Sequence, residues 1–187
     1  KNTKLISIMY VNNELGTINP IDEISMISKK NGILFHTDAV QAIGKKKISL
    51  YNSNINMLSL SAHKFYGPKG VGLLYVKNGT KLNATYFGGG QESNLRPGTE
   101  NIGGIYGMSL SLEKSINELQ TFYQKMIDLE NIFLNHLTNQ NVQFKLDINE
   151  EEKEILYLKS DLHVAPSYIE GFGNATLEAM SHGCTSI

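Results

Sequence analysis

Residues 4–38 read KLISIMYVNNELGTINPIDEISMISKKNGILFHTD, and this stretch decides the fold. The apolar run at residues 4–10 is typical of a buried strand and ends in a polar, glycine-containing loop. A helix is expected from about Pro20, with acidic residues in its first turn, lysines in its last turn and Gly32 as its C-cap. A second strand follows at residues 33–37, so that Asp38 stands at its end. The stretch therefore predicts a strand–helix–strand unit of an α/β layer with a largely parallel sheet.

Two further strands are expected downstream. Residues 57–61 form an apolar run, and residues 71–76 form another with no helix before it, so we expect this last strand to run antiparallel to its neighbour. Asn13, Asp38 and Lys64 each come just after the C-terminal end of a predicted strand. Ligands of open α/β sheets bind at that edge. Residues 99–137 are predicted to be helical, and the composition changes near residues 139–141.

The bulk composition is that of an ordinary soluble globular protein. The chain has 187 residues, 41% of them hydrophobic, and a formal net charge of −1, which gives no reason to expect nucleic acid or an anionic membrane as partner. No window approaches the roughly 20 apolar residues that span a bilayer. The single cysteine, Cys184, excludes an internal disulfide and a multi-cysteine metal site. One thiol also fits a reducing compartment, so a cytoplasmic location is predicted.

The residues around Lys64 give the strongest chemical signal in the chain. Ser61-Ala62-His63-Lys64 is followed by Tyr66-Gly67-Pro68-Lys69-Gly70. A strand-end lysine in a partly desolvated pocket can have its pKa lowered enough to form a Schiff base. Pyridoxal phosphate needs such a lysine, and it needs a carboxylate that keeps its ring nitrogen protonated. Asp38 suits that task, although an isolated aspartate and lysine at strand ends more often form a salt bridge or a solvated pair.

Four motifs carry a family resemblance: residues 11–17 (VNNELGT), 36–41 (HTDAVQ), 61–64 (SAHK) and 88–92 (GGGQE). Their order and spacing resemble those of the cysteine desulfurases, which are fold-type-I pyridoxal-phosphate enzymes of the class V aminotransferase group. The resemblance covers about residues 4–138. It implies that residues 1–138 form a partial fold-type-I large domain, a mostly parallel sheet with helices.

The resemblance also implies roles for the matching residues. Lys64 would form the Schiff base with pyridoxal 5'-phosphate, and Asp38 would face the pyridine nitrogen. Gln41 would hydrogen-bond the phenolic oxygen of the ring. His63 and Ser61 would hold the phosphate, although Ser61 could equally be a packing hydroxyl.

Two more residues and the partners follow from the same resemblance. Asn13 would lie near the phenolic oxygen and the substrate carboxylate, unless it only turns its loop. Thr99 would reach the phosphate of the cofactor in the other subunit, which implies a homodimer with shared active sites. The substrate would be L-cysteine, converted to alanine with transfer of sulfur, and a sulfur-acceptor protein is a further partner. The lysine run at residues 45–47 is interpreted as solvated surface.

The desulfurase reaction needs more than these residues. The family uses a nucleophilic cysteine and a substrate-binding arginine in its C-terminal third, and the residues after about 140 do not resemble that region. Cys184 lies in SHGCT (residues 181–185), which is unlike the family's cysteine loop, and it is better interpreted as a small buried residue. The segment that precedes Lys1 in the family is also missing. We therefore expect this chain to be inactive alone.

Beyond the change in composition near residues 139–141, the sequence predicts strands at residues 142–146 and 162–165 and helices at residues 150–159 and 175–182.

Residues 141–187 resemble a second family. The segment from Ser160 to Gly183 is similar to the donor-binding region of retaining family-4-type glycosyltransferases, which implies a partial Rossmann-like segment. By that resemblance Glu178 would bind the donor ribose and Glu170 would lie near the transferred sugar of a nucleotide-sugar; alternatively, the two are a cap and a solvated helix face. Three hypotheses stay open: a desulfurase with a foreign tail, a glycosyltransferase, and a chimeric or truncated product without activity.

Overall fold

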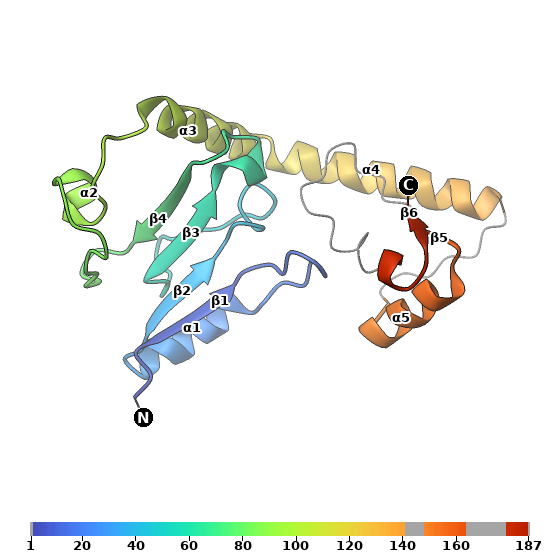
Figure 1. The fold of residues 1–187 in the computed structure, drawn as a ribbon, viewed down its shortest axis with the longest axis horizontal. Helices are drawn as coiled ribbons and strands as arrows, with labels where there is room; N and C mark the ends of the chain where they lie inside the picture. Colours follow the sequence, from blue (N-terminus) through green and yellow to red (C-terminus); the bar gives the residue numbers. More distant parts are fainter. Residues whose placement is uncertain (1, 141–147, 164–178, 187) are drawn as a thin grey trace. The chain divides into compact units, whose positions relative to one another are not determined.

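The computed structural model describes residues 2–140, 148–163 and 179–186 (Figure 1). The chain divides into two compact units, Lys1–Ile127 and Asp128–Ile187. The first unit ends inside helix α4 (Leu119–Asn139), before the join predicted near residues 139–141. The assignment of residues 1–138 and 141–187 to two different domains stays a prediction.

The first unit contains a four-stranded sheet in the order β1-β2-β3-β4. The strands β1, β2 and β3 are parallel to one another, and β4 runs antiparallel to β3 (Figure 1). The α/β class, the mostly parallel sheet and the antiparallel fourth strand are thereby confirmed. The strands are β1 (Leu5–Met9), β2 (Leu34–Asp38), β3 (Met57–Ser61) and β4 (Gly72–Val76).

Helix α1 (Ile21–Lys30) connects β1 to β2 as the sequence predicts. Acidic residues occupy its first turn and lysines its last turn, an arrangement that complements the helix dipole. Gly32 follows with a φ of +63°, a backbone conformation that glycine adopts without a Cβ penalty. The buried hydroxyl of Ser28 donates to the carbonyl of Ile33 at 2.6 Å, which fixes the entry into β2.

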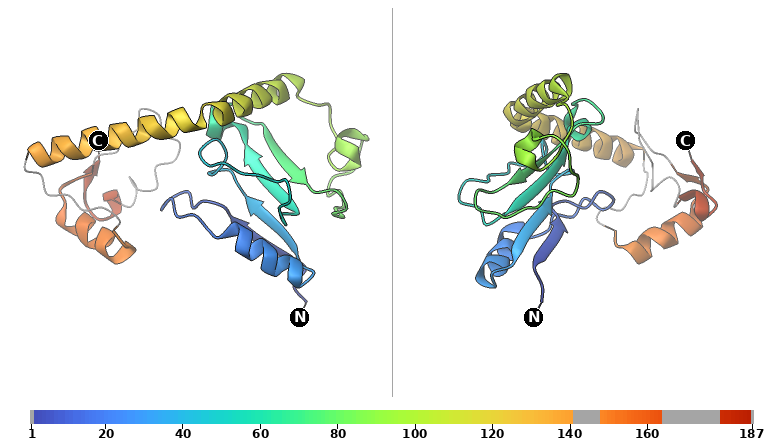
Figure 2. Two further views of the ribbon diagram at one scale, coloured as in Figure 1. Left: turned by 180° about the vertical axis from the view of Figure 1, so that it is seen from behind. Right: turned by 60° about the vertical axis from the view of Figure 1, so that its left-hand side comes forward.

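The hydrophobic core lies on one face of this sheet. Phe35, Leu58 and Leu60 point into it and pack with Ile21 of α1 and Met108 of helix α3 (Ile102–Asn117). The alternation of strand side chains sends the residues between them to the opposite face. That second face is partly open in the first unit, because Leu5 and Leu74 on it are about half exposed whereas Met57 on it is buried. Figure 2 shows the sheet from two further directions.

A row of polar side chains crosses the open face. Ser7 on β1 stands opposite His36 on β2 in the parallel register. The hydroxyl of Ser7 lies 2.7 Å from His36 Nδ1, and the hydroxyl of Ser59 on β3 lies 3.2 Å from His36 Nε2. His36 is thus a strand residue, as expected, and both of its ring nitrogens are hydrogen-bonded within the sheet.

The other elements follow the predicted pattern in part. The region predicted as helical is divided at Glu118 into α3 and α4. In the second unit, a capping box of Asn149 and Glu152 begins α5 (Glu150–Lys159), which coincides with the predicted helix. The short strands β5 (Leu162–His163) and β6 (Thr185–Ser186) pair in parallel. A further helical turn, α2 (Gln91–Asn94), contains the left-handed residues Glu92 and Ser93.

Some predicted elements lie outside the described residues, namely the strand at 142–146 and most of the helix at 175–182. Within the described ranges, no helix is both long and apolar enough to cross a membrane.

The side chain of Thr37 places a hydroxyl group in the hydrophobic core, where its effect on stability can be measured. Its side chain is fully buried, and Oγ1 has no hydrogen-bond partner among the described residues. A buried hydroxyl without a partner costs about 1–3 kcal/mol, so Thr37→Val should raise the free energy of unfolding by about 1 kcal/mol in urea denaturation. Ser28→Ala is the matched control, because it removes a buried hydroxyl that does have an acceptor, and it should lower the free energy of unfolding. A loss of stability in Thr37→Val would contradict the expectation.

Candidate active site

The segments that follow β1, β2 and β3 meet at one edge of the sheet. Asp38, the last residue of β2, stands opposite Ser59 of β3. The amide of Ala39 donates to the carbonyl of Ser59 at 2.9 Å, and the amide of Tyr10 donates to the carbonyl of Asp38 at 2.7 Å. The C-terminal ends of the three parallel strands are therefore joined by backbone hydrogen bonds, as expected for a ligand-binding edge.

The Asp38 carboxylate is oriented by its own turn. Its Oδ1 accepts a hydrogen bond from the amide of Val40 at 2.9 Å. The chain then reverses tightly, with the amides of Ala42 and Ile43 both donating to the carbonyl of Ala39 at 2.9 Å. Ala39 and Ala42 are fully buried, and Gln41 between them stays half-buried. The turn thus presents Asp38 and Gln41 at the same edge.

Lys64 lies in the 3₁₀ turn η1 (Ala62–Phe65) directly after β3. Ala62 and Phe65 are buried and anchor the turn, whereas His63 and Lys64 between them are exposed. The amide of Gly67 closes the turn on the carbonyl of Ala62 at 2.9 Å. A Cβ at Gly67 would stand 2.9 Å from that carbonyl oxygen, so the turn requires glycine there. This close approach explains why the sequence motif contains glycine at position 67.

Ser61 and His63 form a pair beside Lys64. The hydroxyl of Ser61 lies 2.9 Å from His63 Nδ1. Because Nδ1 is engaged by the serine, the ring is oriented and Nε2 faces outward from the pair. While this hydrogen bond is in place, the neutral pair has one proton left for an anionic group: Nε2–H if the hydroxyl donates to Nδ1, or the Ser61 O–H if Nδ1–H donates to the hydroxyl.

The loop after β1 uses a different asparagine from the one that the sequence singled out. Asn12 Oδ1 accepts from the amides of Glu14 and Leu15 at 2.9 and 2.8 Å, so Asn12 organises the turn. Asn13 is exposed at the tip of the loop. The side chain that organises this turn is therefore that of Asn12 and not that of Asn13. The predicted contact of Asn13 with a ligand stays a prediction.

The described contacts do not join Thr99 to the other predicted site residues. It is exposed and lies on the long loop between β4 and α3. The neighbouring Gly98 is fixed by its amide, which donates to Gln91 Oε1 at 3.2 Å. Arg96 stacks over the ring of Tyr86 at 5.7 Å. The contact of Thr99 with the cofactor phosphate of the other subunit stays a prediction.

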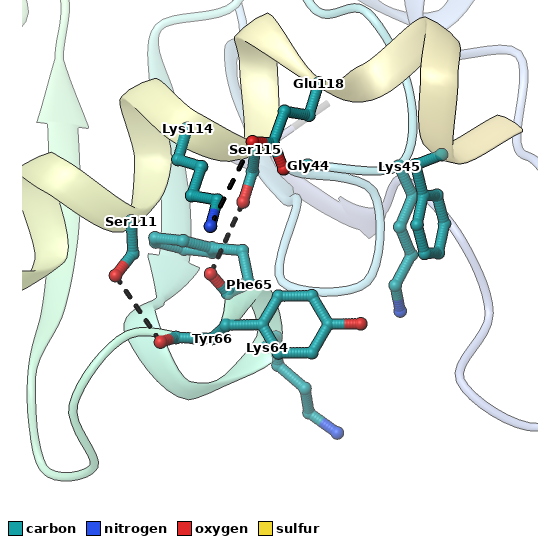
Figure 3. A pocket seen from close by; sticks show the side chains of 10 residues that line it. Gly44, Lys45, Lys64, Phe65, Tyr66, Ser111, Lys114, Ser115 and Glu118 are labelled. Atoms are coloured by element: carbon teal, nitrogen blue, oxygen red, sulfur yellow. Dashed lines mark hydrogen bonds and ion pairs between the residues drawn. The ribbon is translucent and has the colours of Figure 1, made fainter.

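A cavity of about 370 Å³ adjoins Lys64 (Figure 3). Lys64 and Tyr66 line it on one side, Gly44 and Lys45 on another, and α3 contributes serine hydroxyls that bond the backbone of η1. Partial burial, together with the charge of Lys64, lowers the pKa of Lys45. All three lysines of the run 45–47 are exposed, as the sequence indicates, but Lys45 alone lines this cavity. Sequence reasoning missed this residue.

Of the residues that the sequence singled out in the second unit, the structure describes Cys184. Glu170 and Glu178 lie outside the described residues. Cys184 is buried, and its thiol donates toward the carbonyls of Tyr157 and Ser160 at 3.2 Å, which agrees with its interpretation as a small buried residue. Among the described residues, no group of three or more His, Cys, Asp or Glu could hold a metal ion.

Comparison with known proteins identifies relatives of most of this chain. The family model for "Aminotransferase class-V" matches residues 1–160. Cysteine desulfurase IscS of Dictyoglomus turgidum is 42% identical over 91% of this chain and 42% of its own length. Cysteine desulfurase IscS of Clostridium botulinum is 46% identical over 78% of this chain and 36% of its own length. The chain thus spans less than half the length of these curated relatives.

Solved structures give the same result for the fold. A NifS-like protein superposes with a TM-score of 0.69 and 43% identity, covering 73% of this chain and 38% of that one. A structure described as SspA in complex with cysteine superposes with a TM-score of 0.61 and 32% identity, covering 97% of this chain and 55% of that one. These comparisons give no support to the glycosyltransferase resemblance, and the class-V match extends into the segment 141–187 as far as residue 160.

Proposed function

This chain belongs to the aminotransferase class-V family, and from that premise we propose that it carries the cofactor-binding sheet of a pyridoxal-phosphate-dependent cysteine desulfurase. The observation that carries the proposal is that Asp38 and Ser61 end the adjacent parallel strands β2 and β3, and that the other candidate ligands follow within three residues of these strand ends, namely Gln41, His63 and Lys64. Curated relatives named cysteine desulfurase, and a solved relative described with cysteine, support the same substrate.

The chemistry of these side chains fits pyridoxal phosphate. An amine, a carboxylate, an amide and a hydroxyl–imidazole pair match the aldehyde, the ring nitrogen, the phenolic oxygen and the phosphate of the cofactor. Asp38 has one oxygen held by the amide of Val40, so the carboxylate is oriented before any ligand binds. Ser61 and His63 are likewise paired in advance. A site with side chains already oriented loses less conformational entropy on binding.

In the proposed site each residue has a defined role. Lys64 binds the cofactor through its amine, Asp38 holds a proton on the ring nitrogen, and Gln41 donates to the phenolic oxygen. Ser61 and His63 bind the phosphate. When bound, the cofactor supplies a ring that withdraws electrons from the substrate carbon. Lys64, once its amine is free, can also move a proton at that carbon.

Two remaining residues would act toward substrate and partner. Asn13, exposed on the loop after β1, would approach the substrate carboxylate. Thr99, exposed on the loop before α3, would contact the phosphate in the second subunit of a homodimer. The sulfur would leave on a cysteine of the whole protein and pass to an acceptor protein.

The proposal is tested by titrating the 187-residue chain with pyridoxal phosphate and recording the visible spectrum. We expect a visible absorbance band of the bound cofactor that saturates at one equivalent per chain and changes when L-cysteine is added. L-alanine, which lacks the thiol, is the matched control for the substrate. A chain that develops no band beyond that of free cofactor would contradict the proposed function.

A further inference from the structure

Lys45 differs from the two lysines that follow it. It lies four residues after Gln41 in the reversing segment that begins at Asp38, where the amide of Lys45 donates to the carbonyl of Ala42 at 3.1 Å. Its Nζ donates to Gln41 Oε1 at 3.4 Å. It also lines the cavity beside Lys64, whereas Lys46 and Lys47 do not. The Lys45 side chain therefore contacts the predicted cofactor ligand Gln41 and also lines the cavity beside Lys64; Figure 3 shows Lys45 and Lys64 among the residues that line this cavity.

The contact restricts how the Gln41 amide can be oriented. A glutamine side chain has one acceptor oxygen and one NH₂ group with two donors, and an ammonium group can only donate. When the Lys45 ammonium binds Oε1, the NH₂ group of Gln41 is the end that faces away from Lys45. A rotated amide would place NH₂ against the ammonium, and that arrangement brings two donors together. Lys45 thus selects the amide orientation in which the NH₂ group of Gln41 can donate to an acceptor on the side away from Lys45.

The charged groups that line the cavity leave Gln41 as the hydrogen-bond partner of Lys45. Lys64 on η1 faces the same cavity and carries a charge of the same sign. Lys114 and Glu118 also line it, but they pair with each other at 4.0 Å. Burial and the charge of Lys64 both lower the pKa of Lys45. The neutral oxygen of Gln41 is therefore the hydrogen-bond partner that the described contacts give to the Lys45 ammonium.

We propose that Lys45 is a positioning residue of the cofactor site, which holds Oε1 of Gln41 so that the amide NH₂ donates to the phenolic oxygen of pyridoxal phosphate. The inference rests on the proposed function for the identity of the ligand. The orientation of Gln41, in contrast, is a property of the protein without cofactor. The two parts can therefore be tested separately.

The first measurement uses the protein without added cofactor. The ¹H–¹⁵N signals of the Gln41 side-chain amide, identified by their loss in Gln41→Glu, should shift in Lys45→Met. They should stay in place in Lys46→Met, which removes the neighbouring exposed charge without the contact. Lys45→Arg, which can still donate to Oε1, should restore signals near those of the wild type. Equal shifts in Lys45→Met and Lys46→Met would overturn the role of Lys45 in orienting Gln41.

The second measurement adds pyridoxal phosphate. Lys45→Met should weaken binding about 3- to 10-fold, the size expected for misplacing one hydrogen bond, and should shift the absorbance maximum of the bound cofactor. Lys45→Arg should restore both, and Lys46→Met should change neither. If the wild type binds the cofactor and Lys45→Met behaves as Lys46→Met does, the positioning role is overturned while the proposed function stands. If the wild type binds none, the proposed function fails, and the amide signals alone decide whether Lys45 orients Gln41.

Discussion

Lys64→Ala should abolish the covalent attachment of pyridoxal phosphate to this chain. Lys64 is held at the predicted cofactor edge because Ala62 and Phe65 on either side of it are buried and fix the turn η1. After incubation with the cofactor and reduction with borohydride, peptide mass analysis should find the pyridoxyl group on Lys64 of the wild type. In the variant, the label at this site and the visible band should both be lost.

Lys69→Ala is the matched control for Lys64→Ala. Lys69 is exposed, belongs to the same sequence motif and lies five residues further along the chain. Its removal should leave the specific labelling and the visible band as in the wild type. If Lys64→Ala keeps a band of wild-type intensity, or if the label is spread evenly over exposed lysines, Lys64 is not the cofactor lysine.

Phe35→Ala should have the largest effect on stability. Phe35 on β2 is fully buried, and it packs in the core cluster that joins α1, α3 and the sheet. Truncating a buried phenylalanine costs about 3–5 kcal/mol, because apolar contacts are lost and a cavity remains. A domain of this size is stable by only about 5–15 kcal/mol, so the midpoint of urea denaturation should fall steeply or the fold should be lost.

The control for Phe35→Ala is Leu74→Ala. Leu74 lies on β4 and is about half exposed on the open face, so its truncation should change the free energy of unfolding much less. Circular dichroism during urea titration compares the two variants. Because β2 also positions Asp38, Phe35→Ala should weaken cofactor binding as well. Equal denaturation midpoints for the two variants would show that the core does not depend on Phe35.

The strands, and the position of Lys64 directly after β3, could be predicted from the sequence because their signals are local. Short apolar runs flanked by polar loops predict strands, and the predicted bounds of β3, residues 57–61, agree with the observed ones. The same kind of pattern predicts Asp38 at the end of β2, where the structure has it. Gly67 and its neighbours form a motif because the turn after Ala62 tolerates no Cβ. Parallel pairing then brings the strand ends together by topology alone.

What the sequence could not predict depends on contacts in space. The choice of Asn12 over Asn13 for the loop turn follows from backbone geometry that two adjacent asparagines do not reveal. The sequence does not distinguish Lys45 from Lys46 and Lys47. In the structure, the chain reversal after Asp38 places Lys45 against Gln41. The spacing of four residues between Gln41 and Lys45 is the one sequence signal that indicates this contact. The glycosyltransferase resemblance rested on one short stretch, which is too little to define a fold.

The polar row on the open face has a consequence for how the sheet assembles. A slip of β1 against β2 by one residue would expose the apolar side chains, and the hydrophobic pattern already disfavours it. A slip by two residues keeps each face intact but places Leu5 or Met9 opposite His36 instead of Ser7. That misalignment breaks the 2.7 Å contact of the imidazole with the serine hydroxyl. Hydrophobic burial alone does not disfavour a slip by two residues, but the hydrogen bonds of His36 with Ser7 and Ser59 do. These contacts therefore stabilise the register in which the C-terminal ends of the strands are aligned.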